Sequence, residues 1–160
     1  MNERVRGVLV TPADTMLLIK RIRPDIAPYW VLPGGGVEPG NESREAALLR
    51  EIREEIAGTA QIVSLLHILG EPGERHFFYL ARVARWSFED RSGPEFAIPG
   101  RGEYVLEQVP LTIAGLRSVD LKPDEIARFL RCALRRDGGL FALPDLRQAF
   151  TGLSEDQAGG

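Results

Sequence analysis

Three consecutive glycines, Gly34–Gly36, precede a segment in which apolar and acidic side chains recur with helical spacing. The pattern predicts a helix over residues 43–57, since its apolar positions fall within roughly 60° of one another at about 100° per residue. These apolar positions are Leu49, Ile52 and Ile56. The helix therefore has one face that must be buried against the rest of the chain.

The same helix carries a second, acidic face. By the same count, three carboxylates project from one side, roughly opposite the apolar positions: Glu51, Glu54 and Glu55. Like charges this close destabilise an isolated helix unless something neutralises them. Carboxylate oxygens one turn apart suit the hard cations Mg²⁺ and Mn²⁺. Arg50 is spaced to pair with Glu54. The acidic face is therefore a candidate metal site.

The glycines predict the second half of a site. After a short strand predicted over residues 30–32, Pro33 and the three glycines indicate a tight loop that runs into the helix. Unpaired N–H groups at a helix start, with glycines that let a ligand approach closely, form an anion site. An anion site beside a cation site suits a diphosphate, because metals neutralise its oxygens and activate a water for attack on phosphorus.

This stretch resembles the Nudix box, G-x5-E-x7-R-E-U-x-E-E-x-G-U, where U is a bulky aliphatic residue. The residues that match in order and spacing are Gly36, Glu42, Arg50, Glu51, Ile52, Glu54 and Glu55. Two positions depart from the pattern, because Ala57 replaces the usual glycine and Gly58 the usual aliphatic residue. We interpret this as a helix end displaced by one residue, with Gly58 as the left-handed cap.

The resemblance to the Nudix family implies both a fold and a chemistry. The fold is of the α/β (α+β) class, an α/β/α sandwich with a central mixed β-sheet. The implied activity is that of a pyrophosphohydrolase, which uses Mg²⁺, with Mn²⁺ possible, to cleave a nucleoside diphosphate linked to another moiety. The implied metal ligands are Glu51, Glu54, Glu55 and the carbonyl of Gly35.

The remaining roles follow from the same stretch. We assign Glu54 and Arg50 to catalysis, and the backbone of Gly34, Gly35 and Gly36 to substrate binding. Glu54 is the first choice of general base, and Glu95 and Glu103 are alternatives. Oxidised nucleoside triphosphates, nucleotide sugars and dinucleoside polyphosphates all stay open as substrates. Pro72 is explained by a turn over residues 71–74 and does not narrow this choice.

Three other functions are compatible with parts of the pattern. The first is a non-catalytic Nudix-like domain that senses a nucleotide, although such a role does not require the full acid set. The second is diphosphate isomerisation on the same fold, which calls for a cysteine near the site. The single cysteine, Cys132, falls in a later predicted helix, where we expect a half-buried structural thiol. The third is a scaffold whose acidic helix binds a basic partner.

The rest of the chain predicts a mixed sheet and one more helix. Alternating apolar residues and turn signals predict strands over residues 4–10, 15–21, 30–32, 61–69, 75–83 and 103–109. A second helix starts near Pro123 and ends before Gly138. We expect a single domain over residues 1–153 and a flexible tail over 154–160.

Individual side chains on the predicted strands receive structural interpretations. The aromatic residues Phe77, Phe78 and Tyr79 are expected to pack in the core rather than to stack on a base. Three arginines could bind phosphate, but we favour a solvated position for each of them: Arg21, Arg23 and Arg75.

Composition excludes several other classes. The 160 residues include 23 acidic against 20 basic ones, so a net charge of −3 leaves no broad basic surface for bulk nucleic acid. One cysteine cannot form an internal disulfide, and with two histidines there is no Cys/His cluster of zinc-site spacing. No signal-peptide pattern or membrane-length apolar run occurs. We expect a cytoplasmic protein without membrane partners, and a homodimer is possible because dimers are common in the family it resembles.

Overall fold

Eight strands form one mixed sheet in the computed structural model, which describes residues 1–91 and 102–148. The strands are β1 (Asn2–Val10), β2 (Thr15–Ile22), β3 (Tyr29–Val31), β4 (Gly34–Gly36), β5 (Thr59–Glu71), β6 (Glu74–Arg85), β7 (Glu103–Pro110) and β8 (Leu121–Lys122). Their order is β5-β6-β1-β2-β3-β8, with β4 also paired to β1 and β7 to β2. The β1–β6 and β3–β8 pairs are parallel and the others antiparallel.

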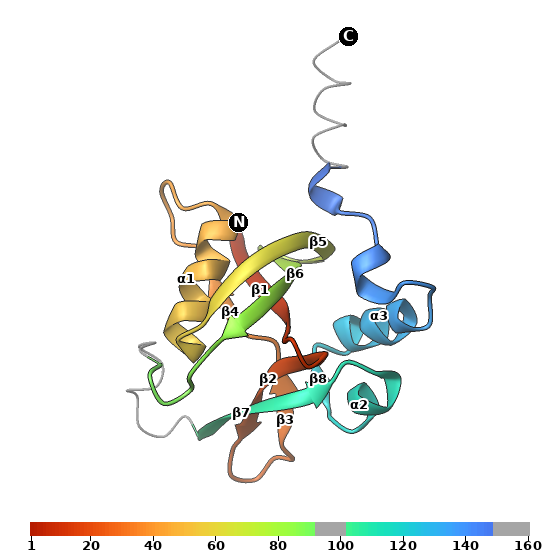
Figure 1. Ribbon diagram of the computed structural model, residues 1–160. Helices are drawn as coiled ribbons and strands as arrows, with labels where there is room; N and C mark the ends of the chain where they lie inside the picture. Colours follow the sequence, from red (N-terminus) through yellow and green to blue (C-terminus); the bar gives the residue numbers. More distant parts are fainter. Residues whose placement is uncertain (92–101, 149–160) are drawn as a thin grey trace.

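Helices cover both faces of this sheet. They are α1 (Arg44–Ile56), α2 (Ile113–Arg117), α3 (Asp124–Leu134) and a 3₁₀ helix (Gly139–Ala142). Figure 1 shows α1 on one side of β1 and β5, and α2 and α3 together on the other side of the molecule. Each side has its own apolar core, one around Ile52 of α1 and one around Leu130 of α3. The predicted α/β/α sandwich is therefore confirmed.

Helix α1 buries a slightly different face from the one predicted. The hydroxyl of Ser43 accepts a hydrogen bond from the backbone N–H of Ala46 at 3.0 Å, which caps the helix start. Leu48 is fully buried with Ile52, whereas Leu49 is only partly buried. The predicted apolar face is therefore confirmed at Ile52 and Ile56 and wrong at Leu49. The buried face of α1 also includes Glu51 and Glu55, so the prediction that these two acids lie roughly opposite the apolar face is wrong.

The end of α1 differs from the interpretation drawn from the box. Ala57, at the position of the usual glycine, takes the left-handed conformation with φ 46° and ψ 39°. Gly58 does not have a positive φ. A side chain at Gly58 would instead press against Ile52 and Ile56 at 3.0–3.1 Å. The helix end is therefore not displaced: Ala57 forms the left-handed cap at a cost in strain, and Gly58 is needed for close packing.

Replacing Ala57 with Gly is expected to stabilise the fold. A left-handed conformation costs an alanine about 1–2 kcal/mol, and glycine removes this strain. Glycine also lowers the free energy of unfolding by about 0.4–1 kcal/mol, because it makes the unfolded chain more flexible. The free energy of unfolding, measured by denaturant titration, should rise by about 0.5–1 kcal/mol. Ala46→Gly, at an exposed helical position of α1, is the control and should lower the same quantity. A fall with Ala57→Gly would contradict the strain argument.

The three glycines form a strand rather than the predicted loop. Strand β4 pairs antiparallel with β1, with Gly34 opposite Arg6 and Gly36 opposite Arg4. Gly34 has φ 152°, and a side chain there would collide with the backbone carbonyl of Val5. The glycines therefore allow β4 to lie directly against β1, and seven residues, 37–43, separate them from α1. The expected loop that runs straight into the helix start is not formed.

The other predicted elements match the structure to within a few residues, and the missed ones are short. The missed elements are β4, α2, β8 and the 3₁₀ helix. Cys132 is exposed on α3, not half-buried as expected. Residues 154–160, the expected tail, lie outside the described residues. Among the described helices, none has the length and hydropathy to cross a membrane.

Candidate active site

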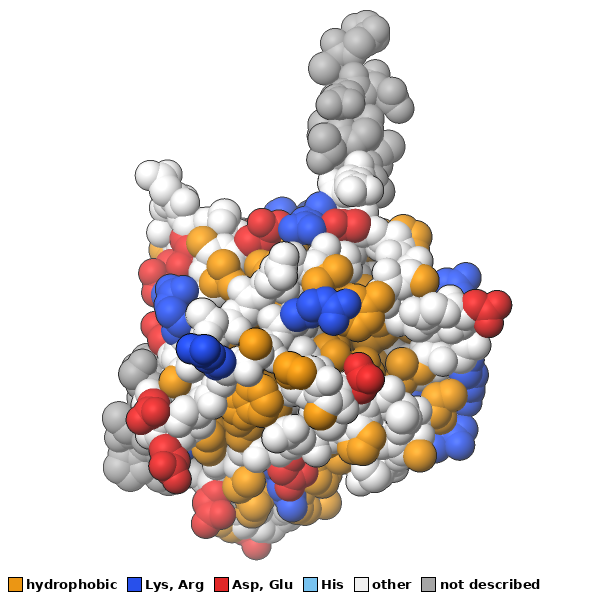
Figure 2. Space-filling view, viewed as in Figure 1, with side chains coloured by type: hydrophobic (Ala, Val, Ile, Leu, Met, Phe, Trp, Pro, Cys, Tyr) orange, Lys and Arg blue, Asp and Glu red, His pale blue; other side chains and the backbone are white. Residues whose placement is uncertain are grey.

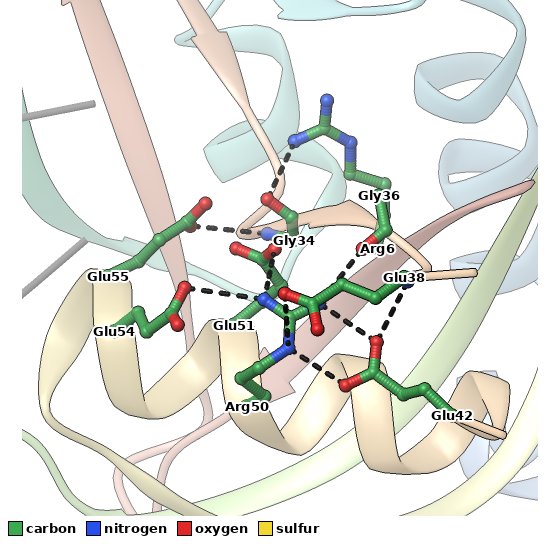
Figure 3. Close-up of polar contacts among 9 residues, drawn as sticks. All are labelled: Arg6, Gly34, Gly36, Glu38, Glu42, Arg50, Glu51, Glu54 and Glu55. Atoms are coloured by element: carbon green, nitrogen blue, oxygen red, sulfur yellow. Dashed lines mark hydrogen bonds and ion pairs between the residues drawn. The ribbon is translucent and has the colours of Figure 1, made fainter. Parts of the chain in front are cut away.

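Arg50 is the centre of a hydrogen-bond network that joins α1 to the preceding segment (Figure 3). Its Nε and Nη2 donate to the two carboxylate oxygens of Glu42 at 2.8 and 3.0 Å. Nη2 also donates to the carbonyl of Gly36 at 3.0 Å. Nη1 donates to Glu51 at 3.0 Å and to Glu54 at 3.4 Å. One guanidinium thus ties the end of β4, the segment before α1 and two box carboxylates together.

These contacts use the whole donor capacity of Arg50. A guanidinium has five N–H groups, and the five hydrogen bonds above occupy them. Arg50 therefore has no donor left for a phosphate in this arrangement. These contacts suit a residue that positions Glu51 and Glu54, and the catalytic role of Arg50 stays a prediction.

Glu42 is held as a carboxylate by the same network. Its hydrogen bonds with Arg50, and then with the backbone N–H of Glu38 at 2.9 Å, lower its pKa from 4.5 to about 2. Oxygen Oε1 of Glu42 accepts from both groups, so this side chain fixes the segment between β4 and α1. The box residue at this position therefore organises the segment that links β4 to α1.

This pKa shift predicts how stability depends on pH. Because the pKa is lower in the folded state, the stabilisation is fully present above about pH 4.5 and is lost as pH falls through 2. The free energy of unfolding, measured by urea titration at several pH values between 2 and 5, should therefore rise with pH. In Glu42→Gln this rise should be smaller. Equal slopes in the two proteins would contradict the prediction.

The carboxylates of Glu51 and Glu55 point inward, toward β4. Both residues are nearly buried, at 8% and 6% exposure. Oxygen Oε2 of Glu55 accepts a hydrogen bond from the backbone N–H of Gly34 at 3.2 Å. The carboxylate of Glu51 lies so close to Gly35 that a side chain there would collide with it. These acids therefore lie close to the glycines as predicted, but the contacts come from the C-terminal half of α1 rather than from its start.

Between β4 and the neighbouring strands lies a cavity of about 300 Å³. It is lined by Glu51 and Glu55 and by three arginines from β1 and β2: Arg4, Arg6 and Arg21. Arg4 and Arg6 are two residues apart on β1 and therefore project from the same face of the strand. This spacing is the sequence signal that could have placed both of them at the site. Burial lowers the pKa of Arg6, and the nearby Glu55 acts in the opposite direction. The cavity therefore combines a pair of carboxylates with a group of guanidinium cations.

Arg21 brings buried donors without hydrogen-bond partners among the described residues to this cavity. Its guanidinium stacks 4.0 Å above the ring of Tyr104. Atoms Nε and Nη2 are buried and have no hydrogen-bond partner among the described residues. The expectation that Arg21 is solvated is therefore wrong, whereas Arg23 and Arg75 are exposed as expected. Phe77, Phe78 and Tyr79 are buried in the cores, which confirms their packing role.

The donor set at this cavity fits a hard divalent cation. Glu51, Glu55 and the backbone of Gly35 offer only oxygen ligands, and β4 is free of side chains where it approaches Glu51. Glu54 does not line the cavity, and its carboxylate turns toward Arg50. Across the described ranges, the three box acids do not converge within 4.8 Å as a set. Glu51 and Glu55 are thus the better placed ligands, and Glu54 would have to leave Arg50 to join them.

The candidate general bases are placed differently. Glu54 is partly exposed beside Arg50, next to the two inward carboxylates. Glu103 is exposed at the start of β7, and its neighbour Tyr104 lines the cavity. Because adjacent strand residues face opposite sides, Glu103 is turned away from the site. Glu95 lies outside the described residues. Glu54 therefore stays the first choice, as a prediction.

Two curated proteins resemble this chain over part of its length. A Bacillus subtilis (strain 168) protein provisionally assigned as an 8-oxo-dGTP diphosphatase is 33% identical over 100 residues, which are 59% of this chain and 64% of that protein. An RNA pyrophosphohydrolase of Acidiphilium cryptum (strain JF-5) is 41% identical over 72 residues, 44% of this chain and 40% of that protein. The matched segment thus covers less than two thirds of either relative.

Solved structures and a family profile agree with this similarity. A Nudix hydrolase of Nitrosomonas europaea shares the fold with a TM-score of 0.60 at 19% identity, covering 89% of this chain and 93% of that one. A MutT structure, from work on the Aliivibrio salmonicida and Vibrio cholerae proteins, gives 0.53 at 25% identity, covering 79% and 94%. The profile of the NUDIX domain matches residues 1–111. This match covers more than half of the sequence and includes the whole network around Arg50, so the chain belongs to the Nudix family.

Proposed function

We propose that this protein is a pyrophosphohydrolase that cleaves a phosphoanhydride bond of a nucleoside diphosphate derivative with the help of Mg²⁺ or Mn²⁺. The observation that carries the proposal is the cavity itself, which Glu51 and Glu55 line together with Arg4, Arg6 and Arg21. Carboxylates that can hold a cation and guanidinium groups that can hold phosphate oxygens are what a diphosphate requires on its two sides.

The residues of the proposed active site would have separate roles. Glu51, Glu55 and the carbonyl of Gly35 would hold the cation, which when bound neutralises phosphate oxygens and makes water a better nucleophile. Arg21 would donate its free Nε and Nη2 to the phosphate group. Arg50 would keep Glu51 and Glu54 in place. Glu54 would accept the proton of the attacking water.

We take a nucleoside triphosphate, including oxidised forms, as the first substrate class. One matched relative is described as a diphosphatase of 8-oxo-dGTP, and the cavity adjoins a second one, of about 180 Å³, through the shared side chain of Arg6. On the face in Figure 2, basic side chains of the described residues are interspersed with acidic ones rather than gathered in one area. This favours a small nucleotide over bulk nucleic acid. The exposed free thiol of Cys132 is consistent with a cytoplasmic protein.

A substrate panel tests the proposal. Nucleoside triphosphates with normal and oxidised bases, nucleotide sugars, dinucleoside polyphosphates and a 5′-triphosphate RNA would be incubated with Mg²⁺, and release of phosphate and pyrophosphate measured. We expect Mg²⁺-dependent turnover of at least one small nucleotide. Tight nucleotide binding without turnover would instead support a sensor, and neither binding nor turnover would support a scaffold.

Arg21→Ala is expected to weaken substrate binding. A hydrogen bond between charged groups contributes about 1.5–3 kcal/mol, which corresponds to a change of about 10- to 100-fold. We therefore expect the KM of Arg21→Ala for the best substrate of the panel to rise by about this factor. Arg23→Ala, two residues along the same strand end and exposed, should leave KM unchanged. Equal effects of the two variants would exclude a specific phosphate contact of Arg21.

A further inference from the structure

A second group of metal-ligating side chains lies at the turn between β5 and β6. Glu71 ends β5, Glu74 begins β6, and these two residues pair across the hairpin. His76 follows two residues later on the same side of β6 as Glu74. One ligand atom from each of the three side chains lies within 4.8 Å of those of the other two. The sequence showed no Cys/His cluster of zinc-site spacing, and it is the hairpin that brings this mixed set together.

The backbone of this turn is held in place from two directions. Gly73 takes φ 79° in the turn, and its carbonyl accepts a hydrogen bond from the backbone N–H of Asn2 at 2.9 Å. Strand β6 then pairs with β1 along its length, with His76 opposite Arg4. The positions of the three side chains therefore depend on the sheet and not on a free loop.

The imidazole is already directed at a carboxylate. Atom Nε2 of His76 lies 3.0 Å from Oε2 of Glu74, and the ring stacks on Phe78 with 16° between the planes. The other oxygen of Glu74, Oε1, lies 3.9 Å from Arg4, so Oε2 is the one available on the His76 side. An ion at this place would be approached by one nitrogen and two carboxylates.

We propose that Glu71, Glu74 and His76 form a second divalent-metal site, which takes a transition metal such as Zn²⁺ in preference to Mg²⁺. A nitrogen ligand favours Zn²⁺, whereas the all-oxygen set around Glu51 favours Mg²⁺. Three protein ligands leave a coordination position open. Glu71 and His76 also line the 180 Å³ cavity that shares Arg6 with the proposed substrate cavity. A cation here adds positive charge beside that cavity.

Isothermal titration of the full chain with Zn²⁺, in millimolar Mg²⁺ to occupy the box carboxylates, tests this site. We expect one Zn²⁺ per chain, and a loss of affinity of about tenfold or more in His76→Gln. His67→Gln is the matched control, because His67 is the other histidine of the chain and also lies near a glutamate, 3.3 Å from Glu125. Cys132→Ser controls for the exposed thiol.

The outcomes separate this site from the proposed active site. Glu55→Gln should keep the affinity for Zn²⁺, whatever happens to turnover. Zn²⁺ binding that survives His76→Gln, or that disappears in Glu55→Gln, Cys132→Ser or His67→Gln, would overturn the proposal. Circular dichroism of each variant shows that it is folded, and Glu71→Gln should reproduce the loss if His76→Gln also lowers stability.

Discussion

Glu55→Gln is expected to lower Mg²⁺-dependent turnover on the order of 10²–10³-fold, because it removes one of the two inward carboxylates at the cavity. Metal ions contribute several kcal/mol to such reactions, and each 1.36 kcal/mol is a factor of ten in rate. The amide of the variant can still accept the hydrogen bond from the N–H of Gly34, so the fold should survive. The measurement is kcat at saturating substrate, together with the Mg²⁺ concentration needed for half-maximal rate.

Substitutions of two further glutamates of α1 serve as comparisons for Glu55→Gln. Glu45→Gln makes the same chemical change near the start of α1, where the carboxylate pairs with Arg147 at 2.8 Å and lies outside the cavity. It should leave turnover unchanged. Glu54→Gln separates two roles: a general base affects kcat without changing the Mg²⁺ requirement, whereas a metal ligand changes both. Full activity in Glu55→Gln would refute the proposed metal site.

The fold was largely predictable from the sequence because its long elements carry clear periodic signals. Helix α1 and the long strands β1, β5 and β6 were predicted within a few residues. Strand β4 was not, because three glycines carry no side-chain pattern and their pairing partner, β1, is far away in sequence. The two-residue strand β8 pairs with β3 in the same non-local way. Such pairings depend on tertiary contacts that a local pattern does not contain.

The acidic residues of the candidate site could be predicted from the sequence, whereas the roles of its arginines could not. Glu51 and Glu55 lie near the glycines as predicted, but helical spacing alone did not show that they would be buried or that Glu54 would turn toward Arg50. The box did not show that Arg50 would be saturated by Glu42 and its other partners. Arg21 appeared solvated because a single arginine on a strand has no signal for burial. Its burial depends on tertiary structure, because residues of β2, β4 and β7 line one cavity together.

Gly35→Ala is the second change with a large expected effect. The backbone at Gly35 does not have a positive φ, so an alanine is compatible with its conformation. The obstacle is the carboxylate of Glu51, which occupies the space that the new Cβ would need. Either that carboxylate or β4 must move, and a misplacement of about 1 Å at a catalytic group can cost on the order of 10²-fold in rate. We expect kcat/KM to fall by about that factor.

Substitutions at the neighbouring glycines show whether the effect of Gly35→Ala comes from its contact with the carboxylate of Glu51. A Cβ at Gly36 meets nothing within 4 Å, so Gly36→Ala should leave the position of Glu51 unchanged and lower activity less than Gly35→Ala does. Gly34→Ala would collide with the carbonyl of Val5 and should lower stability as well as activity. If Gly35→Ala lowers the melting temperature, adding Glu51→Asp should restore part of the loss. Aspartate is one methylene shorter than glutamate, so its carboxylate lies farther from the new Cβ. Equal activity of Gly35→Ala and Gly36→Ala would mean that Glu51 does not need its position against β4, and the assignment of the cavity as the active site would then have to be abandoned.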